Sequence, residues 1–223
     1  MPSPESVAEA LAVVRRRIAS ATARPERVEV VAVTKGHGAE AVRSALAAGV
    51  LDVGENYARE LLAKEAELPS GSPRRWHFLG AVQRNKVPEL AALVAVWQSV
   101  DRAEEARRIA SFRPGATVLV EVALFSGPGR GGVARPAAAG LVEEARSLGL
   151  AVAGLMAVGP PGPPEDARQG FRWLASEARR LGLSEVSMGM SADLEVAVEE
   201  GSTMVRVGTA LFGPRPGAPG LGR

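Results

Sequence analysis

The sequence predicts an α/β fold, a single (β/α)8 TIM barrel with an extra N-terminal helix. Three observations predict this fold. Short apolar segments alternate with longer amphipathic ones, a pattern typical of parallel strands joined by crossover helices. Eight apolar segments can be counted, the number that closes such a barrel, and 223 residues is an ordinary length for it. An amphipathic helical segment precedes the first of them.

The first expected element is a helix over residues 4–21, because Val7, Leu11 and Val14 recur at helical spacing. Strands are expected where short apolar runs occur, at residues 28–33, 51–54, 76–79, 94–99, 117–123, 152–157, 184–188 and 204–207. Helices are expected between them, where apolar residues lie three or four positions apart, at residues 39–48, 57–67, 83–93, 102–112, 136–148, 164–181 and 191–200.

An open, doubly wound sheet is the alternative arrangement of these elements. Such a sheet normally carries a G-x-G-x-x-G turn after its first strand, and the stretch "VTKGHGAE" supplies only Gly36 and Gly38 of that spacing. The count of eight strands therefore favours the closed barrel.

No long linker divides the chain, so residues 1–213 are expected to form the barrel as one domain. The stretches "FSGPGRGG" (residues 125–132) and "GPPGPPED" (residues 159–166) are rich in Gly and Pro and are interpreted as loops after strands. Residues 214–223, which are also rich in Pro and Gly, are expected to be a flexible C-terminal tail.

Composition excludes several functional classes. The chain has no cysteine, so disulfides, thiolate metal sites and a cysteine nucleophile are excluded, and two histidines make metal chemistry unexpected. A net charge of +2 without a basic block argues against a nucleic-acid partner. The chain lacks a long apolar run and a secretory N-terminal segment, so we expect a cytoplasmic protein that does not enter a membrane. A single barrel can be monomeric, and we expect a monomer.

Lys35 stands directly after the first predicted strand, in the stretch "VAVTKGHG". Only three of the 27 cationic residues are lysines, so surface positions have been filled with arginine. An amine beside an apolar wall can lose its proton and attack a carbonyl, which an arginine cannot do. Lys35 is thus either a nucleophilic amine at the barrel mouth or a solvated strand end.

A phosphate site is predicted at the carboxyl ends of the last two strands. The active site of a (β/α)8 barrel lies at that end, often with a phosphate held after strands seven and eight. "SMGMSAD" places Ser191 before a predicted helix, and "RVGTA" places Gly208 and Thr209 at a second helix start. Their hydroxyl and backbone N–H groups suit an anion. The alternative is that Ser191 and Thr209 are ordinary helix caps.

Arg206 is predicted to face the barrel interior, because alternation along the last strand separates it from Val205 and Val207. A buried guanidinium needs a partner, which is either a cofactor or phosphate, or else Glu121 or another acid at a strand end in an ion pair. Asn56 and His77 follow or end neighbouring strands and are expected at the same mouth, although an Asn at that place is commonly a helix cap.

An amine after strand one, a phosphate site after strands seven and eight, and an inward arginine together suggest pyridoxal 5′-phosphate (PLP). Its aldehyde would form a Schiff base with Lys35 while its phosphate is held across the mouth.

The chain resembles the pyridoxal phosphate homeostasis protein family, whose barrel is similar to the N-terminal domain of alanine racemase. The resemblance rests on "VAVTK", "VGENYARE", "WHFLGAVQRNK", "GLMAVG" and "MGMSADLEVAVEEGSTMVRVGTALFG". It implies that Lys35 is the cofactor lysine, that Ser191, Gly208 and Thr209 hold the phosphate, and that Arg206 lies by the ring nitrogen or the phosphate.

Two stretches depart from the family pattern. "KGHGAE" replaces the usual aromatic or polar residue and proline after the lysine. "EVALFSGPGRGG" has Glu121, Ala123 and Arg130 where the family commonly has Gln, Asn and Lys, which leaves the strand-five side of the pocket open.

The resemblance implies a carrier of PLP, acting in vitamin B6 and amino-acid homeostasis and supplying PLP-dependent apo-enzymes, without catalytic turnover and with no catalytic or metal-binding residues. A racemase needs a second base, which alanine racemase draws from a further domain and a dimer partner. We expect that domain to be missing here. The alternatives are a small PLP-dependent amino-acid racemase or lyase that uses Lys35 with His77 or Tyr57, and an aldolase-like barrel enzyme for another phosphorylated metabolite.

Overall fold

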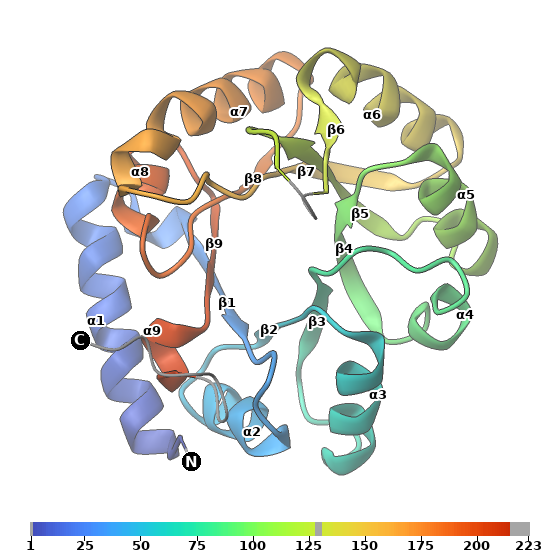
Figure 1. Ribbon diagram of the computed structural model, residues 1–223. Coiled ribbons are helices and arrows are strands. Elements are labelled where there is room, and N and C mark those ends of the chain that lie inside the picture. The colour runs from blue at the N-terminus through green and yellow to red at the C-terminus, as the bar shows by residue number, and fades with distance from the viewer. Residues whose placement is uncertain (1, 128–130, 215–223) are drawn as a thin grey trace.

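The computed structural model describes residues 2–127 and 131–214, and it confirms the predicted barrel (Figure 1). Parallel strands form a ring in the order β4-β3-β2-β1-β9-β8-β7-β5, and pairing between β4 and β5 closes it. The ring strands are β1 (Glu29–Val33), β2 (Asp52–Glu55), β3 (Arg75–Phe78), β4 (Val94–Val100), β5 (Thr117–Ala123), β7 (Ala151–Met156), β8 (Glu185–Ser187) and β9 (Met204–Val207).

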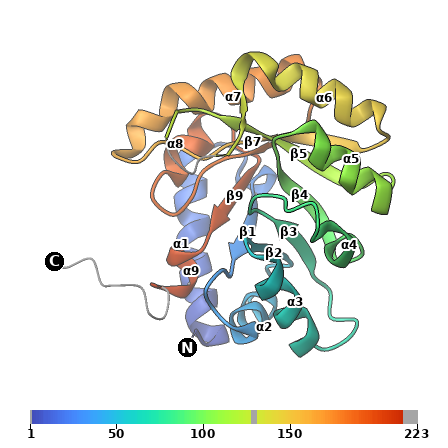
Figure 2. The same ribbon diagram turned by 45° about the vertical axis from the view of Figure 1, so that its right-hand side comes forward.

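Helices cover the outside of this ring, as Figures 1 and 2 show. They are α1 (Pro4–Ala21), α2 (Ala39–Ala47), α3 (Ala58–Glu67), α4 (Val87–Leu90), α5 (Ala103–Phe112), α6 (Ala138–Ser147), α7 (Arg168–Arg180), α8 (Leu194–Glu199) and α9 (Thr209–Phe212), with 3-10 turns at Pro25–Arg27, Arg135–Ala137 and Pro164–Ala167. In the described ranges, none of these helices is long and apolar enough to cross a membrane.

The N-terminal helix α1 has the predicted bounds and packs its apolar face on the barrel. Ser3 caps it, since the Ser3 side chain accepts a hydrogen bond from the backbone N–H of Ser6. Val7 and Leu11 are buried in one cluster with residues of α2, α8 and α9. The helix therefore covers the side of the barrel where the last strand meets the first.

Two predicted helices are shorter than expected. The helix predicted at residues 83–93 is reduced to α4, because residues 83–86 form a turn and Pro88, which has no N–H, cannot make the hydrogen bond to Arg84 that a longer helix would need. The helix predicted at residues 191–200 begins at Leu194, because the Asp193 carboxylate accepts a hydrogen bond from Met190 N–H at 2.6 Å. A short extra strand, β6 (Val133–Ala134), pairs with β5 and was not predicted.

The apolar core lies mainly between the strands and the surrounding helices. Trp76, Trp97 and Phe171, for example, are at most 2% exposed. The barrel interior also holds buried polar side chains, including those of His77, Gln98 and Arg206. Buried polar groups are costly unless they are hydrogen-bonded, so this interior is built around polar contacts as well as apolar packing. The predicted tail lies outside the described residues except for Pro214.

Candidate functional site

A cavity of about 290 Å³ opens at the carboxyl ends of the barrel strands. It brings together six of the seven residues predicted for the site, which are Lys35, Asn56, Ser191, Arg206, Gly208 and Thr209. A neighbouring hollow of about 420 Å³ shares Lys35, Asn56 and Glu121 with this cavity and extends toward the loop after β5. The amine and the predicted phosphate loops thus lie around one space.

Lys35 lies in a tight turn two residues after β1. The N–H of His37 donates a hydrogen bond to the carbonyl of Thr34 at 3.0 Å, which closes the turn. Gly36 occupies its third position with φ of 76°, a conformation that favours glycine. The "KGHG" sequence therefore builds a turn that holds Lys35 at the edge of the cavity.

A second lysine, Lys64 of α3, holds this turn from behind. Its side chain is 3% exposed, and its ammonium donates to the Thr34 carbonyl at 2.8 Å and ion-pairs with Glu55. The Thr34 hydroxyl donates to the same Glu55 carboxylate at 2.7 Å. Burial raises the pKa of the Glu55 carboxyl, and the adjacent Lys64 ammonium opposes that rise.

Glu60, also on α3, adds a third contact to the turn. Its carboxylate accepts a hydrogen bond from the N–H of Gly36 at 2.8 Å and lies 3.4 Å from the Lys64 ammonium. We name the four side chains of Thr34, Glu55, Glu60 and Lys64 the lysine clamp. Through it, strand β2 and helix α3 fix the backbone on both sides of Lys35.

The loops after β8 and β9 meet, as the predicted phosphate site requires. The Ser191 hydroxyl accepts a hydrogen bond from the N–H of Ala210 at 3.1 Å, which ties the first loop to the start of α9. A Cβ at Gly208 would lie 3.0 Å from the Val33 carbonyl, so a side chain there would crowd β1. Ser191 lies in a turn before α8, so the expected helix start at this residue is wrong.

Arg206 faces the barrel interior, as predicted, and is 5% exposed. Its guanidinium donates to the Ser187 hydroxyl at 2.7 Å and to the Ala157 carbonyl at 2.8 Å. Both acceptors are neutral, so the hydrogen bonds described for Arg206 do not neutralise its charge. Burial lowers the pKa of Arg206 to about 10, against the opposing effect of the Glu121 and Asp193 carboxylates.

The cavity fits a cofactor that carries an anion and an aldehyde. Arg206 presents a buried positive charge, and in the described part of the chain the buried Asn56 Oδ1 has no hydrogen-bond partner. Such an atom is costly to bury without a donor, which a bound molecule can supply. Together with Lys35 in the lining of the same cavity, these groups match the chemistry of PLP.

His77 does not line the cavity, although the sequence placed it at the mouth. Its ring is 1% exposed inside the barrel, where Nε2 lies 2.8 Å from Asp52 Oδ1 and Nδ1 lies 2.6 Å from Gln98 Nε2. Alternation along β3 predicts the face on which His77 lies but not its depth. Tyr57 is also absent from the lining and is 58% exposed.

Several lining residues were missed by the sequence analysis. His37 lines the cavity, with its ring tilted against Phe212 at 5.5 Å between centroids. Leu79, Met156 and Met190 supply apolar wall. The position of His37, two residues after Lys35, could have predicted that it lines the cavity. The apolar residues could not have been predicted, because they resemble ordinary core residues. The altered residue Arg130 lies outside the described ranges.

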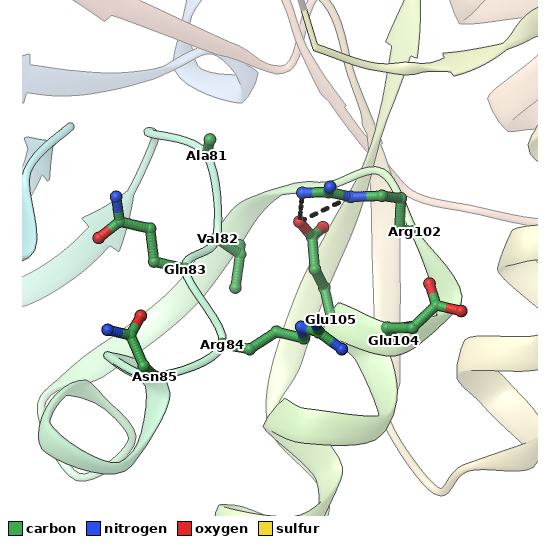
Figure 3. Close-up of a pocket in the computed structure, with 8 residues that line it drawn as sticks. All are labelled: Ala81, Val82, Gln83, Arg84, Asn85, Arg102, Glu104 and Glu105. Carbon is green, nitrogen blue, oxygen red and sulfur yellow. Dashed lines mark hydrogen bonds and ion pairs between the residues drawn. The ribbon is translucent and has the colours of Figure 1, made fainter.

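Figure 3 shows another hollow, of about 550 Å³, between the loop after β3 and the start of α5. Arg102 and Glu105 face each other there as an ion pair. Two of its four charged lining residues thus pair with each other, and none of the predicted site residues contributes to it. In the residues that the structure describes, no cluster of His, Asp and Glu suits a metal ion.

Comparison with known proteins shows which family the chain resembles. The family model of the alanine racemase N-terminal domain matches residues 9–216. A pyridoxal phosphate homeostasis protein of Pseudomonas aeruginosa is 40% identical over 225 residues, covering 96% of this chain and 97% of the relative. The one from Deinococcus radiodurans is 39% identical over 211 residues, covering 93% and 99%.

A solved structure of PipY from Synechococcus elongatus, with PLP bound, has a similar fold. It matches with a TM-score of 0.78 and 35% identity, covering 93% of this chain and all of that one. Structures of larger proteins at 18% identity, including a D-threo-3-hydroxyaspartate dehydratase, share the barrel fold.

Proposed function

Because this chain belongs to the pyridoxal phosphate homeostasis protein family, we propose that it is a carrier of PLP that holds the cofactor on Lys35 without catalytic turnover. The observation that carries the proposal is that Lys35, Arg206 and the Ser191 loop line one cavity. The PLP-bound structure of PipY supports the choice of cofactor.

Bound PLP supplies an aldehyde to which a primary amine can add with loss of water. Lys35 provides that amine, and the lysine clamp holds its turn at the cavity edge. Ser191, Gly208 and Thr209 bind the phosphate in this proposal, while Arg206 lies by the ring nitrogen or the phosphate. Asn56 would offer its unpartnered Oδ1 atom to the cofactor as a hydrogen-bond acceptor.

The biological role proposed is vitamin B6 and amino-acid homeostasis. Reversible capture on Lys35 would buffer the free aldehyde and release PLP to PLP-dependent apo-enzymes. The proposal includes a cytoplasmic monomer with no nucleic-acid or membrane partner, as expected from composition.

The alternative is a small PLP-dependent racemase or lyase, and the position of His37 favours it. A racemase needs two acid or base groups on opposite faces of its substrate. His77 and Tyr57 do not line the cavity, but the His37 ring does. Chiral analysis of a panel of amino acids after incubation with the PLP-loaded protein separates the two functions. Turnover that disappears in both Lys35→Ala and His37→Ala would replace the carrier by an enzyme.

The primary experiment is mass spectrometry after incubation with PLP and borohydride reduction, followed by peptide mapping. We expect one pyridoxyl adduct, on Lys35, because Lys64 is buried in an ion pair and Lys86 lies outside the cavity lining. Lys35→Ala should abolish the adduct, and Lys86→Ala, a change at an exposed lysine paired with Glu89, should leave it unchanged. An adduct that persists in Lys35→Ala would rule out the proposal.

A further inference from the structure

A chain of buried polar side chains runs from the cavity into the barrel interior, beginning at Arg206. The Arg206 guanidinium donates to the Ser187 hydroxyl at 2.7 Å. That hydroxyl in turn donates to Gln98 Oε1, also at 2.7 Å. Ser187 and Gln98 are completely buried. Since a hydroxyl has a single proton, its bond to Gln98 leaves its lone pairs directed at Arg206.

The chain continues to the opposite end of the barrel. Gln98 Nε2 lies 2.6 Å from His77 Nδ1, and His77 Nε2 lies 2.8 Å from Asp52 Oδ1. Arg75 forms a two-pronged ion pair with the Asp52 carboxylate, at 2.7 and 2.6 Å. Each of these bonds joins side chains from two different strands, in the order β9, β8, β4, β3 and β2, and the ion pair of Asp52 with Arg75 joins β2 to β3 a second time.

Asp52, at the end of this series of hydrogen bonds farthest from the cavity, determines which group donates and which accepts in each of them. Ionised Asp52 only accepts, so His77 must donate from Nε2 and has a bare Nδ1 when neutral. A bare Nδ1 requires a donor, which is the amide NH₂ of Gln98. The Gln98 oxygen then faces Ser187 and takes its proton. Reversing any one group would place two donors or two acceptors against each other.

We propose that Ser187, Gln98 and His77 are positioning residues that hold the Arg206 guanidinium at the cofactor cavity, with Asp52 setting the direction of their hydrogen bonds. The proposal rests on PLP being the ligand of the cavity. It assigns a role in cofactor affinity to side chains that do not line the cavity, the farthest of which lies at the other end of the barrel.

Ser187→Ala is the sharpest test, and Ser202→Ala is its matched control. Ser202 is also a buried serine beside β8 and β9, but its hydroxyl donates to the backbone carbonyl of Met188 at 2.7 Å. We expect Ser187→Ala to weaken PLP binding by about tenfold, because Arg206 loses a hydrogen bond made by a charged donor. Ser202→Ala should bind PLP like the parent while melting at a similarly lowered temperature.

Substitution of Gln98 separates positioning from packing. Gln98→Glu keeps an acceptor for the Ser187 proton, so PLP affinity should stay within about threefold of the parent. Gln98→Met has a similar size but frees the Ser187 hydroxyl to turn, so affinity should fall by more than that. If packing alone mattered, Gln98→Met would be the milder change.

The direction of these hydrogen bonds is tested by nitrogen NMR of the protein without PLP, which shows which ring nitrogen of His77 carries the proton. The protein has only two histidines to assign. We expect a neutral His77 protonated at Nε2, and a second proton on Nδ1 in Gln98→Glu. A parent protein with the proton on Nδ1 would overturn the proposal. So would equal PLP affinities in Ser187→Ala and Ser202→Ala, with the parent still forming its Lys35 adduct. If the parent protein forms no PLP adduct, both the proposed function and this inference are wrong.

Discussion

Two buried polar regions flank the cavity, and they treat positive charge differently. On the side of β1 and β2, the Lys64 ammonium is paired directly with the Glu55 carboxylate. On the side of β8 and β9, the hydrogen bonds described for Arg206 end on the neutral oxygens of Ser187 and Ala157. Both cations are at most 5% exposed. The difference lies in their partners and not in their depth.

The comparison assigns the two cations different tasks. A buried charge neutralised by a carboxylate has no need of a ligand, so Lys64 is a structural support for the Lys35 turn. A buried charge whose described hydrogen bonds end on neutral oxygens, with the Glu121 and Asp193 carboxylates acting on it without a hydrogen bond, is neutralised less completely, so Arg206 is suited to bind an anion. Removing Lys64 should therefore reduce stability, and removing Arg206 should reduce binding.

The largest expected effect is that of Lys64→Met on stability. The substitution leaves the Glu55 carboxylate buried without its counter-ion, so we expect the free energy of unfolding to fall by about 3–5 kcal/mol. Denaturant unfolding measures it. The double variant Lys64→Met/Glu55→Gln removes both charges and should recover much of the loss. A double variant no more stable than the single one would contradict the role given to this ion pair.

Arg206→Met tests the role in ligand binding assigned to the region of β8 and β9. We expect PLP affinity to fall by about a hundredfold, which corresponds to the loss of one or two charged hydrogen bonds. The free energy of unfolding without PLP should change little or rise, because an apolar side chain avoids the cost of burying the guanidinium. Absorbance titration with PLP and denaturant unfolding measure the two quantities. Instability comparable to that of Lys64→Met would remove the distinction between the regions.

Asp52, at the far end of the positioning chain, predicts a dependence of stability on pH. Burial alone would raise the pKa of Asp52, but hydrogen bonds from His77 and Arg75 outweigh it, so the folded pKa lies below the ordinary value. The unfolded state then binds more protons between the two pKa values. The stability from Asp52 is complete above an unfolded pKa of about 4 and is lost as pH falls through the folded pKa.

We therefore expect the stability difference between the parent and Asp52→Asn to shrink as pH falls from 7 toward 3. Unfolding curves at several pH values test this expectation. A constant difference would show that Asp52 does not titrate differently in the folded protein.

The barrel and the places of some site residues could be predicted from the sequence, because they depend on local patterns. Alternation along β9 placed Arg206 inside, and the end of β1 placed Lys35 at the mouth. Alternation reports a face and not a depth, which is why His77 was wrongly expected at the mouth. Ser191 was misjudged because a turn built by the Asp193 side chain delays the start of α8.

The role of Lys64 could not be predicted, for a different reason. The sequence shows that lysines are rare in this protein. The contacts of Lys64 with Thr34 and Glu55, however, span 30 and 9 positions and form only when α3 packs on β1 and β2. Because lysines are rare in this sequence, the place of each of them required an explanation. The fold decided which lysine faces the cavity and which one supports it.

The smallest expected effect concerns Glu60, which bonds the turn from the partly exposed edge of the lysine clamp. Glu60→Ala removes the acceptor of the Gly36 N–H, so we expect the free energy of unfolding to fall by about 1 kcal/mol and PLP labelling of Lys35 to slow about threefold. Glu60→Gln keeps an oxygen acceptor and should label at nearly the parent rate, as should Glu67→Ala at an exposed position of the same helix. Rates from reduction at timed intervals test the order. If Glu60→Gln slowed labelling as much as Glu60→Ala, the negative charge near Lys35, and not the hydrogen bond to its turn, would be what α3 contributes at this position.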